Sequence, residues 1–255
     1  MSDDAAIQFQ SVTKEYRAGA LSSEGIKSLL IRLPALLREH RRVQGFRALD
    51  DVTFHVRPGE CFGVIGRNGS GKSTTLGLIA GVLRPDVGEV RVRGRIAPLL
   101  ELGAGFHPYL SGRENIQLNG VLLGLTLREV RGRMESIIEF SELGSFIDRP
   151  LRTYSSGMIA RLGFSVAVHL DPEVLLVDEV LAVGDEGFHR KCFAKMEEFR
   201  HRGVTIVYVS HNLPEIQRIC DRAAMLEAGK LVALDVPKPV IAEYLARLNG
   251  QGQAR

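Results

Sequence analysis

The sequence predicts an α/β fold in which a parallel sheet is accompanied by an antiparallel portion and a helical insertion. Three observations support this fold class: apolar runs of strand length that alternate with helical patterns, a glycine-rich turn between a strand and a helix, and a mostly helical middle of the chain. The chain has 255 residues, of which 45% are hydrophobic and 25% are charged. This composition is typical of a soluble globular protein and excludes a disordered chain, a collagen-like repeat and a membrane-embedded protein.

The elements are expected in the following order. Residues 52–56 alternate between apolar and polar side chains, as a half-buried strand does, and residues 61–65 form the continuous apolar run of a buried strand. Behind a glycine-rich turn, apolar residues recur at helical spacing from 76 to 83. The remaining elements are a strand at 89–93, a helical region at about 100–165, strands at 174–177 and 204–209, a hairpin at 223–234 and a closing helix at about 237–248. Together these elements predict a single domain that spans residues 1–255.

The charge balance and the cysteines disfavour two classes of function, nucleic-acid binding and metal binding by cysteines. The formal net charge is only +3, which does not favour nucleic acid as a partner. Cys61, Cys192 and Cys220 lack the spacing of metal ligands, so reduced thiols in a cytosolic compartment are expected. No run of about 18 apolar residues occurs, and the acidic start of the chain does not resemble a signal peptide. A role at a membrane would therefore require another chain to supply the membrane span.

The segment 17–47 is predicted to be an extra insert. Its apolar residues fit a short helix that ends or kinks near Pro34, and a basic run follows at 38–42. Two interpretations remain open. The helix packs on its own domain, or it is an amphipathic basic element at a membrane surface or on a membrane partner.

The strongest motif is a Walker A sequence at 66–73, Gly-Arg-Asn-Gly-Ser-Gly-Lys-Ser, placed between a predicted strand and a helix. Its glycines let backbone N–H groups surround phosphate oxygens, and the helix N-terminus adds partial positive charge. Lys72 is expected to reach the β- and γ-phosphates, and the Ser73 hydroxyl is expected to bind Mg²⁺. The predicted ligands of the nucleotide in this segment are Gly66, Asn68, Gly69, Ser70, Gly71, Lys72, Ser73 and Thr74. The motif predicts that the protein binds a nucleoside triphosphate.

A second motif supplies carboxylates. The apolar run 174–177 ends in Asp178 and Glu179, which is the Walker B pattern. Asp178 is expected to hold the hydration sphere of Mg²⁺, and Glu179 is placed to polarise the attacking water as a general base.

The segment 154–158, Tyr-Ser-Ser-Gly-Met, precedes an apolar helix for which Ser155 is a suitable N-cap. At this position the sequence resembles the ATP-binding cassette (ABC) ATPases, whose Leu-Ser-Gly-Gly-Gln signature occupies the same place. Three of its five residues differ in this chain. The resemblance implies that two copies form a homodimer, in which Ser155, Ser156 and Gly157 of one copy face the γ-phosphate bound at Lys72 of the other.

Further segments of the chain match the family in order. Residues 182–185, Ala-Val-Gly-Asp, stand where the D-loop belongs, and His211 follows a strand as the switch histidine does. Tyr16 is similar to the aromatic residue that stacks on adenine. The resemblance therefore implies ATP and Mg²⁺ as cofactors, an ATPase activity, and Lys72, Glu179 and His211 as the catalytic residues.

Within the family, the segments 99–108, 112–116, 154–158 and 177–185 resemble the ATPase subunits of bacterial polysaccharide exporters, and so does the extra segment 17–47. This resemblance implies two copies of a separate transmembrane permease, a lipid-linked glycan as the transported substrate, and a location at the cytoplasmic face of the inner membrane. The surface around 106–109 and 112–116 is the expected permease contact. The alternative is another ABC transporter, a small-solute importer or a drug or lipid exporter. A soluble role on DNA or ribosomes is disfavoured by the single cassette and the near-neutral charge.

Two departures from the family pattern affect the interpretation. The stretch before the helical region carries Glu101 where cassettes usually carry a Gln that couples Mg²⁺ and γ-phosphate to the permease. Either Glu101 takes part of that role near the metal, or it only orders the loop. After the closing helix only seven residues follow Leu248, so the glycan-binding C-terminal domain of some exporters is not expected in this chain.

Overall fold

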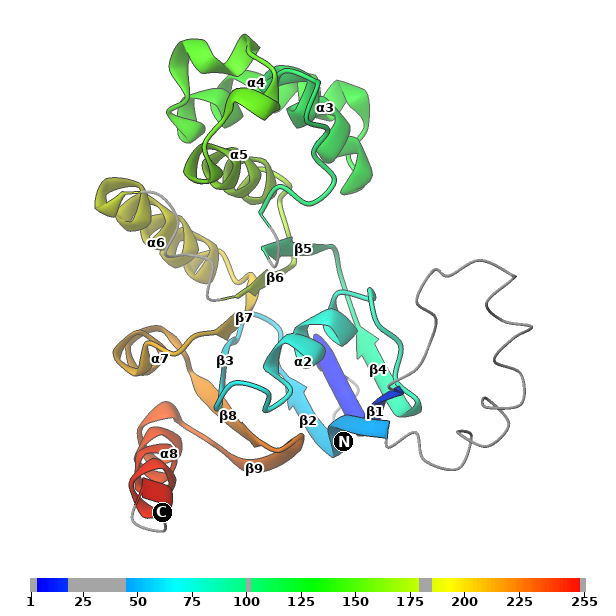
Figure 1. Cartoon of the computed structure of the whole chain (residues 1–255), viewed down its shortest axis with the longest axis vertical. Helices are drawn as coiled ribbons and strands as arrows, with labels where there is room; N and C mark the ends of the chain where they lie inside the picture. The colour runs from blue at the N-terminus through cyan, green and yellow to red at the C-terminus, as the bar shows by residue number, and fades with distance from the viewer. Residues whose placement is uncertain (1–3, 18–44, 100–101, 179–184, 253–255) are drawn as a thin grey trace, which may run out of the picture.

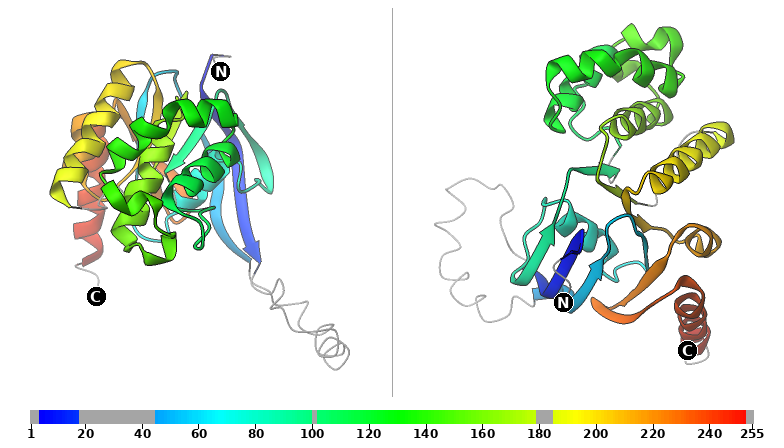
Figure 2. Two further views of the ribbon diagram at one scale, coloured as in Figure 1. Left: turned by 90° about the horizontal axis from the view of Figure 1, so that it is seen from above. Right: turned by 180° about the vertical axis from the view of Figure 1, so that it is seen from behind.

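The computed structural model describes residues 4–17, 45–99, 102–178 and 185–252, with side chains described up to residue 248. Two sheets form the centre of this structure (Figure 1). One has six strands in the order β5-β6-β7-β3-β8-β9, and the other has three in the order β2-β1-β4. The helices α3, α4 and α5 gather at the end of the molecule that lies away from the three-stranded sheet and from α8 (Figures 1 and 2).

The six-stranded sheet is parallel except for its last strand, β9, which pairs antiparallel with β8. Every residue of β3, β6 and β7 is buried, which explains their continuous apolar sequences, because parallel strands covered on both faces have no solvent side. The strands are β3 (Cys61–Ile65), β5 (Ile96–Leu99), β6 (Val174–Val177), β7 (Thr205–Val209), β8 (Arg222–Glu227) and β9 (Lys230–Asp235).

The three-stranded antiparallel sheet consists of β1 (Ile7–Arg17), β2 (Gly45–Val56) and β4 (Val87–Val92). Stacked aromatic rings connect it to the parallel sheet. The ring centroid of Phe54 in β2 lies 4.4 Å from that of Phe9 and 5.3 Å from that of Phe62 in β3. The two sheets therefore share a hydrophobic core, and β1 and β2 are held beside the loop that follows β3.

The helices begin where their sequences provide caps. Capping boxes start α3 and α4, in which Ser111 with Glu114 and Thr126 with Glu129 satisfy one another's backbone N–H groups. The helices are α2 (Lys72–Ile79), α3 (Gly112–Leu122), α4 (Leu127–Ser141), α5 (Ser156–Val168), α6 (Glu186–His201), α7 (Leu213–Ile219) and α8 (Pro237–Gly252), with short 3₁₀ turns η1 (Gly144–Asp148) and η2 (Leu151–Thr153). None of the helices that the structure describes is both long and apolar enough to span a bilayer.

The parallel core, the antiparallel portion and the helical region are confirmed, and three details were wrong. The strands β1 and β5 were not predicted. Arg17 pairs with Gly45 in the β1–β2 ladder, so residue 17 and residues 45–47 belong to strands rather than to the insert. The rest of the predicted insert, 18–44, lies outside the described residues. Helix α2 ends at Ile79 because the chain reverses at Gly81, which adopts a φ of 73°.

Candidate nucleotide-binding site

An open cleft of about 480 Å³ lies where β1, β2, the loop after β3, and the ends of β6 and β7 meet. This is the carboxyl edge of the parallel strands, where open α/β sheets bind their ligands. The cleft is lined by residues from all of the predicted nucleotide motifs except the signature segment: Tyr16, Phe46, Ala48, Asn68, Gly69, Gly71, Lys72, Ser73, Thr74, Asp178 and His211. Glu101 and Glu179 lie outside the described residues.

The Walker A loop is pressed against two strands, and glycine is required at both contacts. A Cβ on Gly71, whose φ is 107°, would stand 2.6 Å from the Ala48 carbonyl oxygen and equally close to Leu49. A Cβ on Gly66 would stand 2.3 Å from the Leu226 carbonyl oxygen at the end of β8. Both distances are far below any tolerable contact, so the loop keeps its shape only with glycine at these positions.

Lys72 is nearly buried, and its ammonium lies across its own loop. The Nζ atom donates hydrogen bonds to the carbonyl oxygens of Gly66 at 2.7 Å and of Arg67 at 3.1 Å. A buried ammonium at the first residue of α2, beside the loop that lines the cleft, suits the phosphates of a nucleotide. The side chains present therefore fit a nucleoside triphosphate.

Gly66 and Ser70 do not line the cleft, although both were predicted to contact the nucleotide. The Ser70 hydroxyl is buried and has no hydrogen-bond partner in the part of the chain that the structure describes. The Ser70 backbone fixes the loop from behind, because its carbonyl oxygen accepts a hydrogen bond from the Gly229 N–H at 3.1 Å. In this structure both residues shape the loop, and their direct contact with nucleotide stays a prediction.

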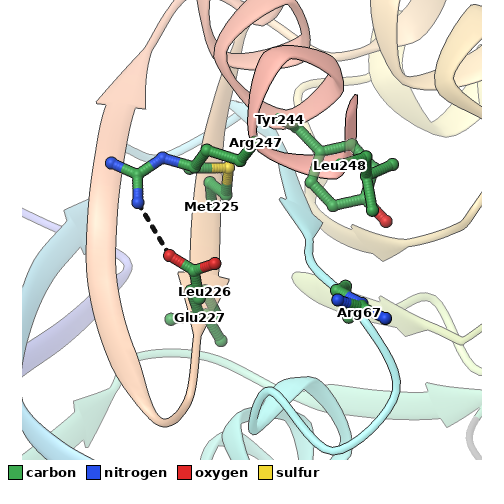
Figure 3. Close-up of a pocket in the computed structure, with 7 residues that line it drawn as sticks. All are labelled: Arg67, Met225, Leu226, Glu227, Tyr244, Arg247 and Leu248. Atoms are coloured by element: carbon green, nitrogen blue, oxygen red, sulfur yellow. Dashed lines mark hydrogen bonds and ion pairs between the residues drawn. The ribbon is translucent and has the colours of Figure 1, made fainter. Parts of the chain in front are cut away.

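A second, smaller pocket lies behind the same loop, between Arg67 and α8 (Figure 3). Its volume is about 10 Å³, which accommodates no more than about one water molecule. Arg247 of α8 forms an ion pair with Glu227 at 2.7 Å along its wall. This pocket is a packing feature between α8 and β8, and the larger cleft is the candidate nucleotide site.

Two oxygen donors in the cleft fit a magnesium ion. Ser73, from the first turn of α2, and Asp178, directly after β6, line the same space. Hydroxyl and carboxylate oxygens are hard ligands of the kind that Mg²⁺ binds together with phosphate oxygens. His211 follows β7, which lies between β6 and β3 in the sheet, and it lines the same cleft.

The cleft has an aromatic end that the sequence only half predicted. Tyr16 was expected there, and it is 42% exposed. Phe46, directly opposite Tyr16 in the β1–β2 ladder, lines the same cleft and is 59% exposed. Sequence reasoning missed Phe46 because it was counted as part of the insert. The sequence alone carries no signal for it, because its position opposite Tyr16 depends on the register of β1 and β2, and β1 was not predicted.

The signature segment lies at the start of α5, apart from the cleft. Ser155 is the predicted N-cap, and its hydroxyl accepts a hydrogen bond from the Met158 N–H at 3.2 Å. Ser155 and Ser156 are exposed, and Gly157 is half-buried. Tyr154 instead points inward: its hydroxyl donates to the Phe146 carbonyl oxygen at 2.6 Å, and burial raises the pKa of this phenol to about 12. The first residue of the signature is therefore structural, and the two serines that follow it are exposed.

Arg161 connects the signature helix to α6. Its guanidinium forms ion pairs with Asp185 at 2.6 Å and with Glu142 at 3.7 Å, and it lies over the ring of Phe188. Asp185 caps α6 by accepting the Phe188 N–H at 2.9 Å, and this hydrogen bond, aided by Arg161, lowers the pKa of the Asp185 carboxyl. Sequence reasoning singled out Asp185 as the end of the D-loop but missed Arg161.

Part of the surface expected to contact the permease is buried. In the segment 112–116, Gly112, Asn115 and Ile116 are buried. The Asn115 amide donates to the carbonyl oxygens of His107, Leu110 and Ser111, so it holds the preceding loop in shape. The exposed residues of this predicted surface are 107–109, where Tyr109 is 71% exposed, and Glu114.

Comparison with known proteins identifies the family. The family described as "ABC transporter" matches residues 49–182, more than half of the chain. The chain belongs to the ABC transporter family. This cassette is 50% identical over 241 residues to an O-antigen export system ATP-binding protein of Klebsiella pneumoniae, which covers 94% of the cassette and 98% of that relative. It is 40% identical over 249 residues to a teichoic acids export ATP-binding protein of Enterococcus faecalis, which covers 98% of the cassette and 54% of that relative.

Solved structures of cassettes share the fold. One is a dimeric ATP-binding cassette in a post-hydrolysis state with ADP and phosphate bound. It has a TM-score of 0.71 and 21% identity, over 91% of this cassette and 99% of that chain. An ATP-binding subunit of an ABC transporter gives a TM-score of 0.72 at 22% identity, over 94% and 93% of the two chains. The predicted ABC-type P-loop fold is thereby confirmed, and as a member of this family the cassette is an ATPase.

Proposed function

We propose that this cassette is the motor subunit of an ABC exporter that moves a lipid-linked polysaccharide, of the O-antigen, capsule or teichoic-acid type, across the inner membrane. The observation that carries the proposal is the 50% identity along almost the whole length of a relative named for O-antigen export. A second relative named for teichoic acids export, at 40% identity, supports the same class of cargo. The cassette would act at the cytoplasmic face of the membrane, attached to two copies of a separate permease.

The cleft suggests how the residues divide the work of hydrolysis. Lys72 would hold the β- and γ-phosphates, and Ser73 and Asp178 would hold Mg²⁺, which when bound neutralises charge on the phosphates. Glu179 would polarise the attacking water, and His211 would contact the γ-phosphate. Phosphoryl transfer of this kind relies on positioning and charge, which such a cleft supplies.

The exposed start of α5 supports a site shared between two copies. Ser155 and Ser156 are exposed, Gly157 is half-buried, and none of the three lines the cleft of its own chain. In a head-to-tail homodimer they would present a helix N-terminus, with its partial positive charge, to the γ-phosphate bound at Lys72 of the partner. Closure of the dimer would then depend on ATP, and hydrolysis would reopen it and reset the permease.

The test is deletion of the gene and complementation with the unaltered cassette or with Glu179→Gln. Loss of polymer from the surface, with lipid-linked polymer accumulating inside, is expected in the deletion strain. The unaltered cassette should restore export, and Glu179→Gln should not, while its turnover falls by two decades or more and ATP binding persists. An unchanged glycan profile in the deletion strain would contradict polysaccharide export and point to another ABC transporter. Near-normal hydrolysis by Glu179→Gln would contradict the general-base role alone.

A further inference from the structure

The aromatic end of the cleft is formed where the end of β1 pairs with the start of β2. In the antiparallel ladder of β1 and β2, Tyr16 is paired with Phe46, and Glu15 is paired with Arg47. Directly paired residues place their side chains on the same face of a sheet, and successive residues alternate between faces. Tyr16 and Phe46 therefore share one face, and Glu15 and Arg47 share the other.

Contacts on the second face fix this arrangement. Arg47 forms ion pairs with Glu15 at 2.7 Å and with Asp50 at 3.1 Å. The Glu15 N–H also donates to the Asp86 carboxylate at 2.7 Å. These contacts hold the ends of β1 and β2 with the charged pair turned away from the cleft, and the aromatic pair is turned toward it. Exposed ion pairs contribute little stability, but here they specify register.

The two rings differ chemically from the rest of the cleft wall. The opposite end is formed by the Walker A residues, Asp178 and His211, which suit phosphates and a cation. Ala48, a small residue on the same strand face as Phe46, also lines the cleft. The side chain of Phe46 leaves much of its apolar area exposed to water, which is unfavourable unless a ligand covers it.

We propose that Phe46 is a second base-binding residue, which together with Tyr16 forms a two-ring platform for the adenine of ATP. A bicyclic purine has the area to cover two neighbouring rings, and stacking of a base on an aromatic side chain is favourable for every base. Phe46 would act on nucleotide affinity and leave phosphate binding at Lys72 to the Walker A loop. The proposal rests on ATP binding in the cleft and not on which cargo is exported, so the two proposals fail independently.

Affinity measurements with two ligands test the platform. With Phe46→Ala, the Kd for ATP should rise about 5- to 100-fold, the range found for the loss of one base–aromatic stack. The Kd for inorganic tripolyphosphate, which has no base, should stay unchanged. Phe46→Leu should give a smaller rise, and Tyr16→Ala a comparable or larger one. Because Phe46 is 59% exposed, its truncation should leave the thermal midpoint nearly unaltered.

Fluorescence supplies a direct readout, because the chain contains no tryptophan. In Phe46→Trp the new indole should be quenched by ATP and not by tripolyphosphate. The matched control is Tyr109→Trp, which replaces an exposed aromatic residue on the helical part, and its fluorescence should not respond. An ATP affinity within twofold of the unaltered cassette in Phe46→Ala would overturn the proposal. Equal losses for ATP and tripolyphosphate would overturn it as well, because Phe46 would then support the cleft as a whole.

Discussion

The cleft at Lys72 and the signature segment at the start of α5 are the two regions to which we assign function, and they differ in how complete they are within one chain. The cleft is formed within one chain: its loop is locked between β2 and β8, its lysine is buried, and both oxygen donors for Mg²⁺ line it. The signature residues Ser155 and Ser156 are held by a capped helix but point into solvent. In the proposed homodimer, the first region binds nucleotide within one chain, and the second would act only on the nucleotide of a second copy.

The largest effect is expected from the region that is complete. Lys72→Ala removes the buried ammonium that would meet the phosphates, so ATP affinity should fall at least about tenfold and hydrolysis by about a thousandfold or more. Isothermal titration and phosphate release measure the two quantities. Lys230→Ala, at an exposed lysine of β9, is the matched control and should change neither. If Lys72→Ala bound ATP normally, the cleft would not be the primary nucleotide site.

The next prediction separates the two regions. Gly157→Asp places a carboxylate at the start of α5, so hydrolysis should fall at least about 100-fold while the isolated subunit binds ATP within about twofold of normal. An equal loss of binding would mean that the segment acts on its own chain.

A mixing experiment makes the same separation sharper. Each of the variants Lys72→Ala and Gly157→Asp is inactive alone, but a mixed dimer contains one site with an intact lysine from one chain and an intact signature from the other. An equal mixture should therefore recover about a quarter of the normal sites, since half of the dimers are mixed and each has one intact site of two. No recovery, in a mixture shown to exchange subunits, would contradict a shared site.

We predict that Arg161 couples the two regions within one chain. This residue ties α5 to Asp185, the cap of α6, which begins shortly after the Walker B segment. Arg161→Ala should lower hydrolysis about tenfold, the scale of one lost charge-assisted hydrogen bond, with little change in ATP affinity. Arg161→Lys should be intermediate, because an ammonium cannot form the same forked contacts. Arg190→Ala, at an exposed pair with Glu186 on α6, is the control. Unchanged hydrolysis in Arg161→Ala would show that the two helices are not coupled through this contact.

The same contrast explains what could be predicted from the sequence. The positions of Lys72, Ser73, Asp178 and His211 follow from local patterns, because a buried strand ending in a polar residue places that residue at the sheet edge. Their meeting in one cleft agrees with the prediction. Arg161 was missed because its contact with Asp185 joins residues 24 positions apart on different helices. No local periodicity reports such a contact.

The antiparallel sheet was the least predictable region. Strand β1 was not expected, because register shifts and the positive φ of Ser11 interrupt its alternation. Without β1, the pairing of Tyr16 with Phe46 could not be inferred. The order of the strands in the six-stranded sheet could not be predicted either, because the sequence of a single strand does not show which strands will be its neighbours.

The smallest expected effect is a pH-dependent change in stability that arises from His169, at the C-terminal end of α5. His169 caps α5, its ring Nδ1–H donates to the Ser165 carbonyl oxygen at 2.6 Å, and its ring lies edge-on to Phe140. Burial is the main cause that lowers the pKa of His169 below 6.5, and the nearby Lys195 and Arg133 add to it, while the Ser165 hydrogen bond and Asp171 oppose it. The unfolded chain therefore takes up a proton at this residue before the folded one does as the pH falls.

The sign of the pH dependence follows from this difference. The contribution of neutral His169 to stability is complete above about pH 6.5 and is lost as the pH falls through the folded pKa. Between pH 7.5 and 5.5 the denaturation midpoint of the unaltered cassette should fall more than that of His169→Gln, whose amide can still donate to Ser165 but cannot titrate. His201→Gln, at an exposed histidine of α6, should behave like the unaltered cassette. Parallel midpoints for His169→Gln and the unaltered cassette would show that the end of α5 does not sense pH. The functional difference between the cleft and α5 would then depend only on the exposed start of that helix.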